Sequence, residues 1–233
     1  RQCVQAHAVL LFDSPDKAAG VKQTLMGDQL AHLLARDDHQ ELLMEASYFI
    51  PGDAFVAELA EMKQRGGRAA VLTNSLATND VIAAHGAYAR YRDGLLQAGV
   101  ELHELKANAR ALHRQVRLFK GRSRASLHTK AMVLDRREVF VGSFNIDPRS
   151  VHLNTEMGYY VASAELGQQV AAFIEEGLAP ENSYRVDKEQ GKLTWAGDGH
   201  DGRPEVHHNE PDVTVWRRML AWLLSLLPIE RML

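Results

Sequence analysis

Four polar side chains in residues 127–145 have types and spacing that suit phosphate chemistry. In the segment LHTKAMVLD, His128 and Lys130 lie two positions apart, and after the charged turn DRRE, Ser143 and Asn145 repeat that spacing. Side chains two positions apart on a strand point to the same face. If the two segments form a hairpin or a tight return, an imidazole, an ammonium, a hydroxyl and an amide converge. The sequence therefore predicts a site for an anionic, tetrahedral phosphate.

The elements that must position these residues alternate between strands and helices. Apolar segments predict strands in QAHAVLLF, ELLMEASYFI, RAAVLTNS, VELHELK, LHTKAMVLD, EVFVGSF and TEMGYYVAS. Helical patterns occur after Gly27 and in AFVAELAEMKQRGG, AHGAYARYRDGLLQAG and ELGQQVAAFIEEGL, and Asp53 is a candidate cap for the second of these helices. The alternation predicts an α/β fold, with a mixed β-sheet flanked by helices on both faces.

The character of the chain changes after Trp195. Residues 1–195 are predicted to form the catalytic unit, and residues 196–233 a linker followed by an amphipathic helix. The linker histidines at positions 200, 207 and 208 lack the partners of a metal site, so no metal is expected. The helix VTVWRRMLAWLLSLLPIERML is too short and too charged at its ends to span a bilayer. Docking on the core and lying in a membrane interface both remain open for this helix.

Charge is distributed unevenly along the chain. The 233 residues carry a net charge of −3, which gives no global attraction to nucleic acid or anionic lipid. Residues 86–130, however, contain ten Lys or Arg and three acidic residues. This basic stretch is either a solvated surface or a phosphate-binding surface, and it runs directly into His128.

The hairpin residues resemble the signature of the phospholipase D superfamily. His128, Lys130, Asp135, Gly142, Ser143 and Asn145 occur at the spacing His-x-Lys-x4-Asp-x6-Gly-Ser-x-Asn. Four other stretches resemble the C-terminal half of bacterial cardiolipin synthases, in particular the cardiolipin synthase C-like branch. They are SYFIPG, LTNSLATND, HGAYARYRDGLLQAGVELHELK and RRMLAWLLSLLPIERML. The resemblance covers most of the chain.

The resemblance implies that this chain holds half of a catalytic centre. Enzymes of the superfamily combine two His-x-Lys motifs, whereas no histidine here other than His128 has a lysine two residues later. The partner is then either an N-terminal half with the other motif or a second copy of the chain. We favour the first, because the matched stretches belong to a C-terminal half and the chain does not begin with Met.

The resemblance also implies a mechanism of phosphatidyl transfer without metal or cofactor, through a phosphohistidine intermediate. Lys130 neutralises charge on the phosphoryl group, Ser143 and Asn145 donate hydrogen bonds to it, and one histidine attacks while the other acts as acid and base. Which histidine attacks is left open, with the acid/base role preferred for His128. Glu156 is expected to orient an imidazole, and Asp135 to orient the hairpin.

By the same resemblance, a phospholipid headgroup is expected to meet Asn74, His85, Tyr88 and Arg92, and the protein to lie peripherally on the cytoplasmic side of a bacterial inner membrane. Two other functions remain open. One is a homodimeric phospholipase D-type phosphodiesterase or nuclease, whose binding to nucleic acid would weaken with salt. The other is a catalytically silent interaction domain.

Overall fold

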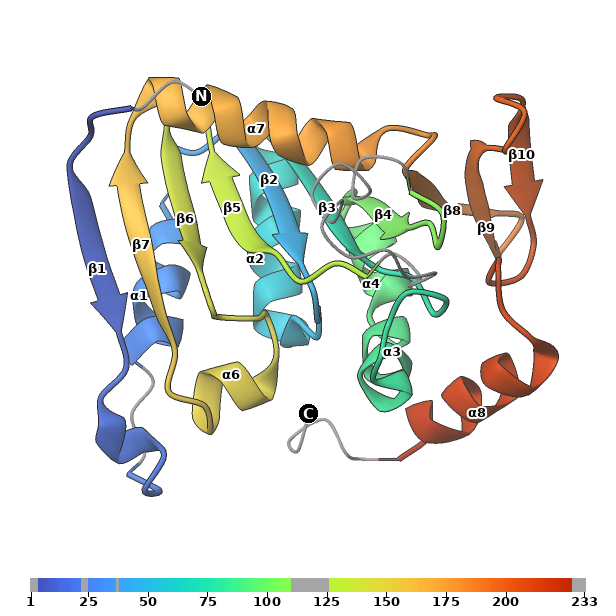
Figure 1. Cartoon of the computed structure of the whole chain (residues 1–233), viewed down its shortest axis with the longest axis horizontal. Helices are drawn as coiled ribbons and strands as arrows, with labels where there is room; N and C mark the ends of the chain where they lie inside the picture. The colour runs from blue at the N-terminus through green and yellow to red at the C-terminus, as the bar shows by residue number, and fades with distance from the viewer. Residues whose placement is uncertain (1–3, 22–24, 37, 110–125, 228–233) are drawn as a thin grey trace, which may run out of the picture.

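A mixed sheet runs through the chain in the computed structural model, which describes residues 4–21, 25–36, 38–109 and 126–227 (Figure 1). Within these residues the sheet has ten strands. Their order is β1 (Ala8–Phe12), β7 (Met157–Ala162), β6 (Glu138–Gly142), β5 (Lys130–Leu134), β2 (Glu41–Ala46), β3 (Arg68–Asn74), β4 (Glu101–Leu105), β8 (Ser183–Glu189), β9 (Lys192–Asp198) and β10 (Pro204–His207). β2, β3 and β4 pair in parallel, and the other neighbours are antiparallel.

Helices cover both faces of this sheet. α7 (Ala164–Leu178) crosses one face, while α1 (Leu25–Leu34), α2 (Gly52–Gln64) and α4 (Arg92–Gln97) pack on the other (Figure 1). Side-chain alternation along β2 divides the core, because Leu43 joins the α7 side whereas Leu42 and Met44 join the opposite side. This arrangement confirms the predicted fold class.

Three shorter elements lie at the margins of the sheet. The 3-10 helix η1 (Pro15–Lys17) follows β1, and α6 (Pro148–His152) lies between β6 and β7 in the chain. α3 (Ile82–Ala89) packs against α8 (Val215–Ser225), which is the last described helix.

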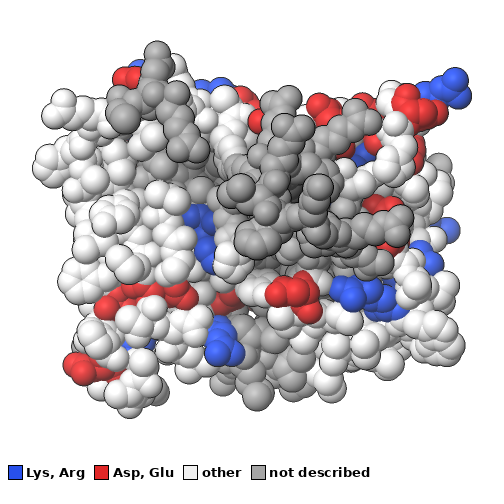
Figure 2. Space-filling view, viewed as in Figure 1, with Lys and Arg blue, Asp and Glu red and all other residues white. Residues whose placement is uncertain are grey.

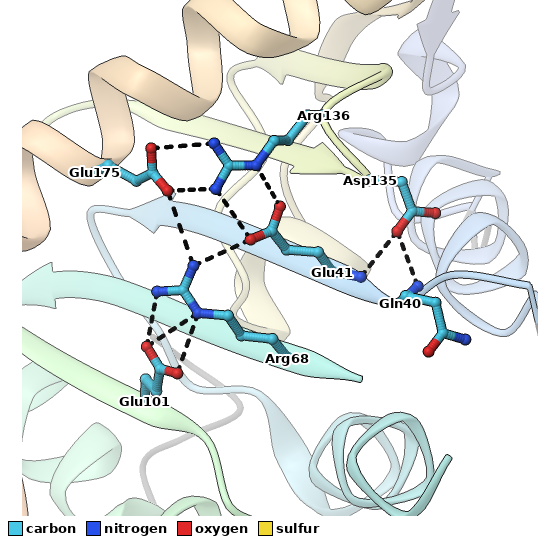
Figure 3. A network of polar contacts seen from close by, with 7 residues as sticks. All are labelled: Gln40, Glu41, Arg68, Glu101, Asp135, Arg136 and Glu175. Carbon is cyan, nitrogen blue, oxygen red and sulfur yellow. Dashed lines mark hydrogen bonds and ion pairs between the residues drawn. The ribbon is translucent and has the colours of Figure 1, made fainter. Parts of the chain in front are cut away.

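The predicted hairpin is formed by β5 and β6, in antiparallel register with Ala131 opposite Val141. Its turn places Asp135 and Arg136 at φ values of 49° and 54°, a left-handed conformation that aspartate tolerates better than most residues. One Asp135 carboxylate oxygen accepts hydrogen bonds from the backbone N–H groups of Gln40 and Glu41, both at 2.8 Å (Figure 3). These bonds fix the turn to the beginning of β2.

Three local predictions are wrong. Pro51 rather than Asp53 occupies the N-cap of α2 and makes no side-chain cap bond, so Asp53 lies within the first helical turn. The helix expected over residues 84–99 is divided into α3 and α4. The segment expected to be a linker after Trp195 instead continues β9 to Asp198 and then forms β10, so the predicted boundary falls inside a strand.

Candidate active site

The Lys130 ammonium lies where β5 begins, directly after the segment that carries His128. Its Nζ donates to Ser47 Oγ at 2.9 Å and to the His128 carbonyl oxygen at 3.0 Å. Because an ammonium has three hydrogens, one remains for a ligand after these two contacts. Burial lowers the pKa of Lys130, while Glu156 and two aspartates nearby oppose that change. His128 itself is exposed to solvent.

Ser143 follows β6 and is joined to β7. Its backbone N–H donates to the Met157 carbonyl at 2.9 Å, and its hydroxyl hydrogen bonds to Glu156. Glycine at position 158 permits this close pairing, because a Cβ there would lie 2.6 Å from a ring carbon of Phe140. Ser143 therefore lies at the same end of the hairpin as Lys130.

Glu156 is buried and fully engaged by polar neighbours. Besides Ser143, its carboxylate accepts hydrogen bonds from Asn154 Nδ2 at 3.1 Å and Ser150 Oγ at 3.3 Å. The His128 ring has no hydrogen-bond partner among the residues that the structure describes. Glu156 is thus placed to hold Ser143 rather than to orient His128, which differs from the role expected from the sequence.

Asn145 is half-buried beside this cluster. Its backbone N–H donates to Ser150 Oγ at 3.3 Å, and Asp147 caps α6 by accepting the Ser150 N–H at 2.6 Å. The amide oxygen of Asn145 is buried without a partner among the described residues. An amide oxygen in this state can accept a hydrogen bond from a ligand hydroxyl, while a phosphoryl oxygen would have to accept from the N–H groups of the same amide.

Three further residues of the site carry no signal in the sequence motif. Ser47 follows β2 and reaches Lys130 because Ala46 pairs with Lys130 in the sheet. Asp80 accepts a 2.7 Å hydrogen bond from the Tyr48 hydroxyl, and the carboxylates of Asp80 and Asp147 both act on the Lys130 pKa. Only the order of the strands reveals that these residues are neighbours.

Asp135 lies at the opposite end of β5 from Lys130, in the hairpin turn. Burial alone would raise its pKa, but hydrogen bonds from His39 and from the N–H groups of Gln40 and Glu41 lower it overall. These contacts join the hairpin turn to the beginning of β2, and the role of Asp135 in orienting the hairpin stays a prediction.

Asn74 does not project toward a substrate. Its amide nitrogen donates to the carbonyls of Ser47 and Leu127, both at 3.0 Å, and its oxygen accepts the Leu127 N–H at 2.9 Å. Both amide hydrogens are therefore used by the backbone. From the sequence we expect a headgroup contact, whereas the structure gives Asn74 the task of holding the segment that leads into His128.

The other three residues expected at the headgroup form a buried network elsewhere. Arg92 lies 2.8 Å from Glu104 and 2.7 Å from Glu210, Tyr88 donates to Glu104 at 2.9 Å, and His85 lies 2.8 Å from Glu210. Burial alone would raise the pKa of Glu210, but His85 and Arg92 lower it to about 2. These side chains join α3, α4 and β4 to the segment before α8.

The basic stretch is only partly described. Arg92 and Lys106 are buried, and Lys106 Nζ donates to the Asp198 carbonyl at 2.6 Å. Arg110, Arg114, Arg117, Lys120, Arg122 and Arg124 lie outside the described residues. In the part of the chain that is described, no three His, Cys, Asp or Glu side chains are grouped to hold a metal ion.

Comparison with known sequences gives one family and several relatives. Residues 34–177 match the family described as cardiolipin synthase, PLD-like domain. The chain is 39% identical to cardiolipin synthase C of Escherichia coli K12, over 99% of this chain and 49% of that protein. It is 25% identical to cardiolipin synthase A of Pectobacterium carotovorum, over 67% of this chain and 28% of that protein. The chain thus spans about half or less of these relatives.

Solved structures share the fold. Nuc from Salmonella typhimurium, a phospholipase D family member, has a TM-score of 0.50 at 16% identity and covers 78% of this chain and 99% of its own. Phosphatidylserine synthase from Haemophilus influenzae Rd KW20 has a TM-score of 0.58 at 12% identity, with 97% of this chain and 48% of its own covered.

Proposed function

The chain belongs to the cardiolipin synthase family with a PLD-like domain, and from this premise we propose that it is one catalytic half of a phosphatidyltransferase that makes cardiolipin. The observation that carries the proposal is the grouping of Lys130, Ser143 and Glu156 beside His128 at one end of the β5–β6 hairpin. A cation and a hydroxyl that lie at the end of the segment carrying His128 would suit a phosphodiester substrate.

In this proposal the reaction takes two displacements at phosphorus. A histidine nitrogen bonds to the phosphorus of a phospholipid, the bond to the leaving alcohol breaks, and the partner histidine gives that oxygen a proton. The hydroxyl of the second phospholipid then gives its proton to the partner histidine, its oxygen bonds to phosphorus, and the bond between phosphorus and the attacking histidine breaks. We assign acid/base catalysis to His128, charge neutralisation to Lys130, and hydrogen bonding of phosphoryl oxygens to the amide N–H groups of Asn145 and to the Ser143 hydroxyl, which must turn away from Glu156 to donate.

The second histidine must come from another polypeptide segment, and we propose an N-terminal half. An uncharged surface beside the site supports this pairing. The surface is formed by exposed apolar side chains of β1, β7 and β6. Tyr159 of β7 lies between Leu10 of β1 and Val141 of β6, and Phe12 of β1 lies opposite Met157 of β7. Figure 2 shows few charged side chains over β1 and β7. Covering such a patch is favourable for a partner with a matching apolar surface.

The alternative is a homodimeric phosphodiesterase or nuclease. The match to Nuc supports this alternative, because the match covers 99% of the Nuc chain. Nuc is therefore a separate chain that consists of this fold alone. Against nucleic acid as substrate, two of the described cations of the basic stretch, Arg92 and Lys106, are buried against protein groups, whereas Arg90 is exposed. We place the proposed enzyme peripherally at the cytoplasmic side of a bacterial inner membrane.

The test is lipid turnover. The chain is incubated with vesicles of phosphatidylglycerol and phosphatidylethanolamine, alone and together with an N-terminal half that carries the second motif. We expect cardiolipin only from the combination, and a loss of about 10²–10⁴ in rate for His128→Ala. His32→Ala, at an exposed position of α1, is the control and should retain full activity.

Other products discriminate between the functions. Phosphatidic acid without cardiolipin, or turnover by the chain alone together with dimerisation on a sizing column, would favour the phosphodiesterase. No product from the combination, or full activity of His128→Ala, would contradict the transferase.

A further inference from the structure

Helix α8 has an unusual orientation, with its large apolar side chains facing outward. Val215, Trp216, Met219, Leu220, Trp222 and Leu223 are each between 44% and 76% exposed. The buried residue of the helix is Ala221, and Arg217 and Arg218 are only half-exposed. A surface helix normally buries its apolar stripe. The apolar face of α8 therefore lacks a cover among the described residues, although the helix is docked through its opposite side.

Backbone contact fixes this orientation. A Cβ added to Gly86 in α3 would lie 2.8 Å from the Ala221 carbonyl oxygen and 3.1 Å from the Ser225 nitrogen. Such a close approach of two helix backbones requires small residues at the contact. The outward position of the tryptophans and leucines is thus set by the packing of α8 on α3, and Figure 1 shows both helices below the ends of the strands.

Arg217 connects α8 to the candidate active site. Its Nε donates to the Leu76 carbonyl at 2.9 Å and its Nη2 to the Asn79 carbonyl at 2.6 Å. The next residue, Asp80, accepts the hydrogen bond from Tyr48 and acts on the pKa of Lys130. Whatever surface covers the apolar face of α8 therefore lies at a fixed position relative to the phosphate-binding residues.

The charges beside α8 match an anionic lipid surface. A cavity of 550 Å³ next to the helix is lined by Arg90, Lys192 and Arg218 together with Trp222. An apolar helix face with tryptophans and flanking cations is typical of helices that lie in the headgroup region of a bilayer. No helix in the described part of the chain combines the length and apolarity needed to pass through a membrane. The 11 residues of α8 suit contact in the membrane plane.

We propose that the outward face of α8 is a bilayer-contact surface, which inserts its tryptophan and leucine side chains at the headgroup boundary of an anionic membrane and sets the candidate active site against the lipid. The inference rests on the proposed function for the nature of the substrate. Binding to a bilayer, however, requires no turnover, so the two can be tested separately.

The experiment measures binding of the full chain to vesicles of phosphatidylcholine alone and of phosphatidylcholine with an equal part of phosphatidylglycerol. Two of the three tryptophans, Trp216 and Trp222, lie exposed on α8, while Trp195 is buried. We expect co-sedimentation with the anionic vesicles and a blue shift of tryptophan fluorescence. Leu223→Glu should weaken binding about tenfold or more, because loss of one buried leucine already changes partition by roughly that factor.

Val206→Glu on β10 is the matched control, since Val206 is similarly exposed but belongs to a strand of the sheet and not to α8. It should bind vesicles like the unmodified chain. His128→Ala should also bind normally while losing turnover, which separates failure of the docking surface from failure of the proposed chemistry. Three results would overturn the proposal. The chain could fail to bind anionic vesicles, or Leu223→Glu and Val206→Glu could bind them equally. The chain could also self-associate without binding vesicles, with Leu223→Glu abolishing that self-association.

Discussion

Replacing Glu45 by glutamine should remove a pH dependence of folding that originates beside the His-x-Lys motif. Glu45 lies in β2, opposite Ala131 of β5, and is only 4% exposed. Thr129, between His128 and Lys130, hydrogen bonds its side chain, and one carboxylate oxygen has no partner among the described residues. Burial therefore raises the pKa of Glu45 to about 7, although the bond from Thr129 opposes this change.

The sign and size of the effect follow from proton linkage. Below the ordinary pKa of 4.5 both the folded and the unfolded chain hold the proton, and the stabilising contribution is complete. As the pH rises toward about 7, the unfolded chain releases the proton while the folded chain retains it, so the free energy of unfolding falls. At about 1.4 kcal/mol per pH unit, the total loss is about 3 kcal/mol.

The assay is urea unfolding at a series of pH values from about 4 to about 8, for the unmodified chain, Glu45→Gln and the exposed control Glu189→Gln. The unmodified chain and the control should lose about 3 kcal/mol more than Glu45→Gln across this range. Parallel pH profiles for all three proteins would refute the argument that Glu45 is protonated when folded.

Three further predictions concern the supports of the site. Gly86→Ala should lower the free energy of unfolding by about 1–3 kcal/mol in urea titrations, because the new methyl group meets the Ala221 carbonyl; an increase would show that α8 is not closely packed. Asp135→Ala should lower the free energy of unfolding by about 1.5–3 kcal/mol, because charged hydrogen bonds to two backbone N–H groups are lost. A decrease smaller than about 0.5 kcal/mol would contradict its role in the hairpin. Arg92→Leu should cost about 3–5 kcal/mol by leaving Glu104 and Glu210 buried without their cation, and calorimetry that finds an unchanged melting temperature would contradict this.

The hairpin and the sheet could be predicted because they depend on local patterns. The period of two in residues 127–135 predicts β5 and the charged turn marks the return into β6, but β5 begins only at Lys130 and β6 ends at Gly142. His128, Ser143 and Asn145, which we expected on the strands, therefore lie in the segments next to them. The alternation of strands with helices was enough to give the layered mixed sheet. In each case the information lies within a few residues of the element it predicts.

The partners of buried polar residues could not be predicted in this way. Arg92 is neutralised by Glu210, more than a hundred residues later in the chain, and nothing in the sequence around either residue indicates the other. Similarly, β10 forms because β9 supplies its hydrogen bonds, while its own residues look like a linker. Glu156 is engaged by Ser143 through the register of β6 and β7, a relation that the spacing of the motif does not contain.

The first strand has a consequence for any attempt to study a smaller piece of this protein. β1 occupies the outer side of β7, and Asp13 directly after it accepts the Glu156 N–H. A piece starting at Leu34 would keep the whole signature and the pairing of β7 with β6, but it would leave unpaired the N–H and C=O groups of β7 that face β1, next to the exposed side chains of Met157 and Tyr159. Open strand margins of this kind invite intermolecular pairing, so such a piece would aggregate, and its inactivity would say nothing about the chemistry of His128.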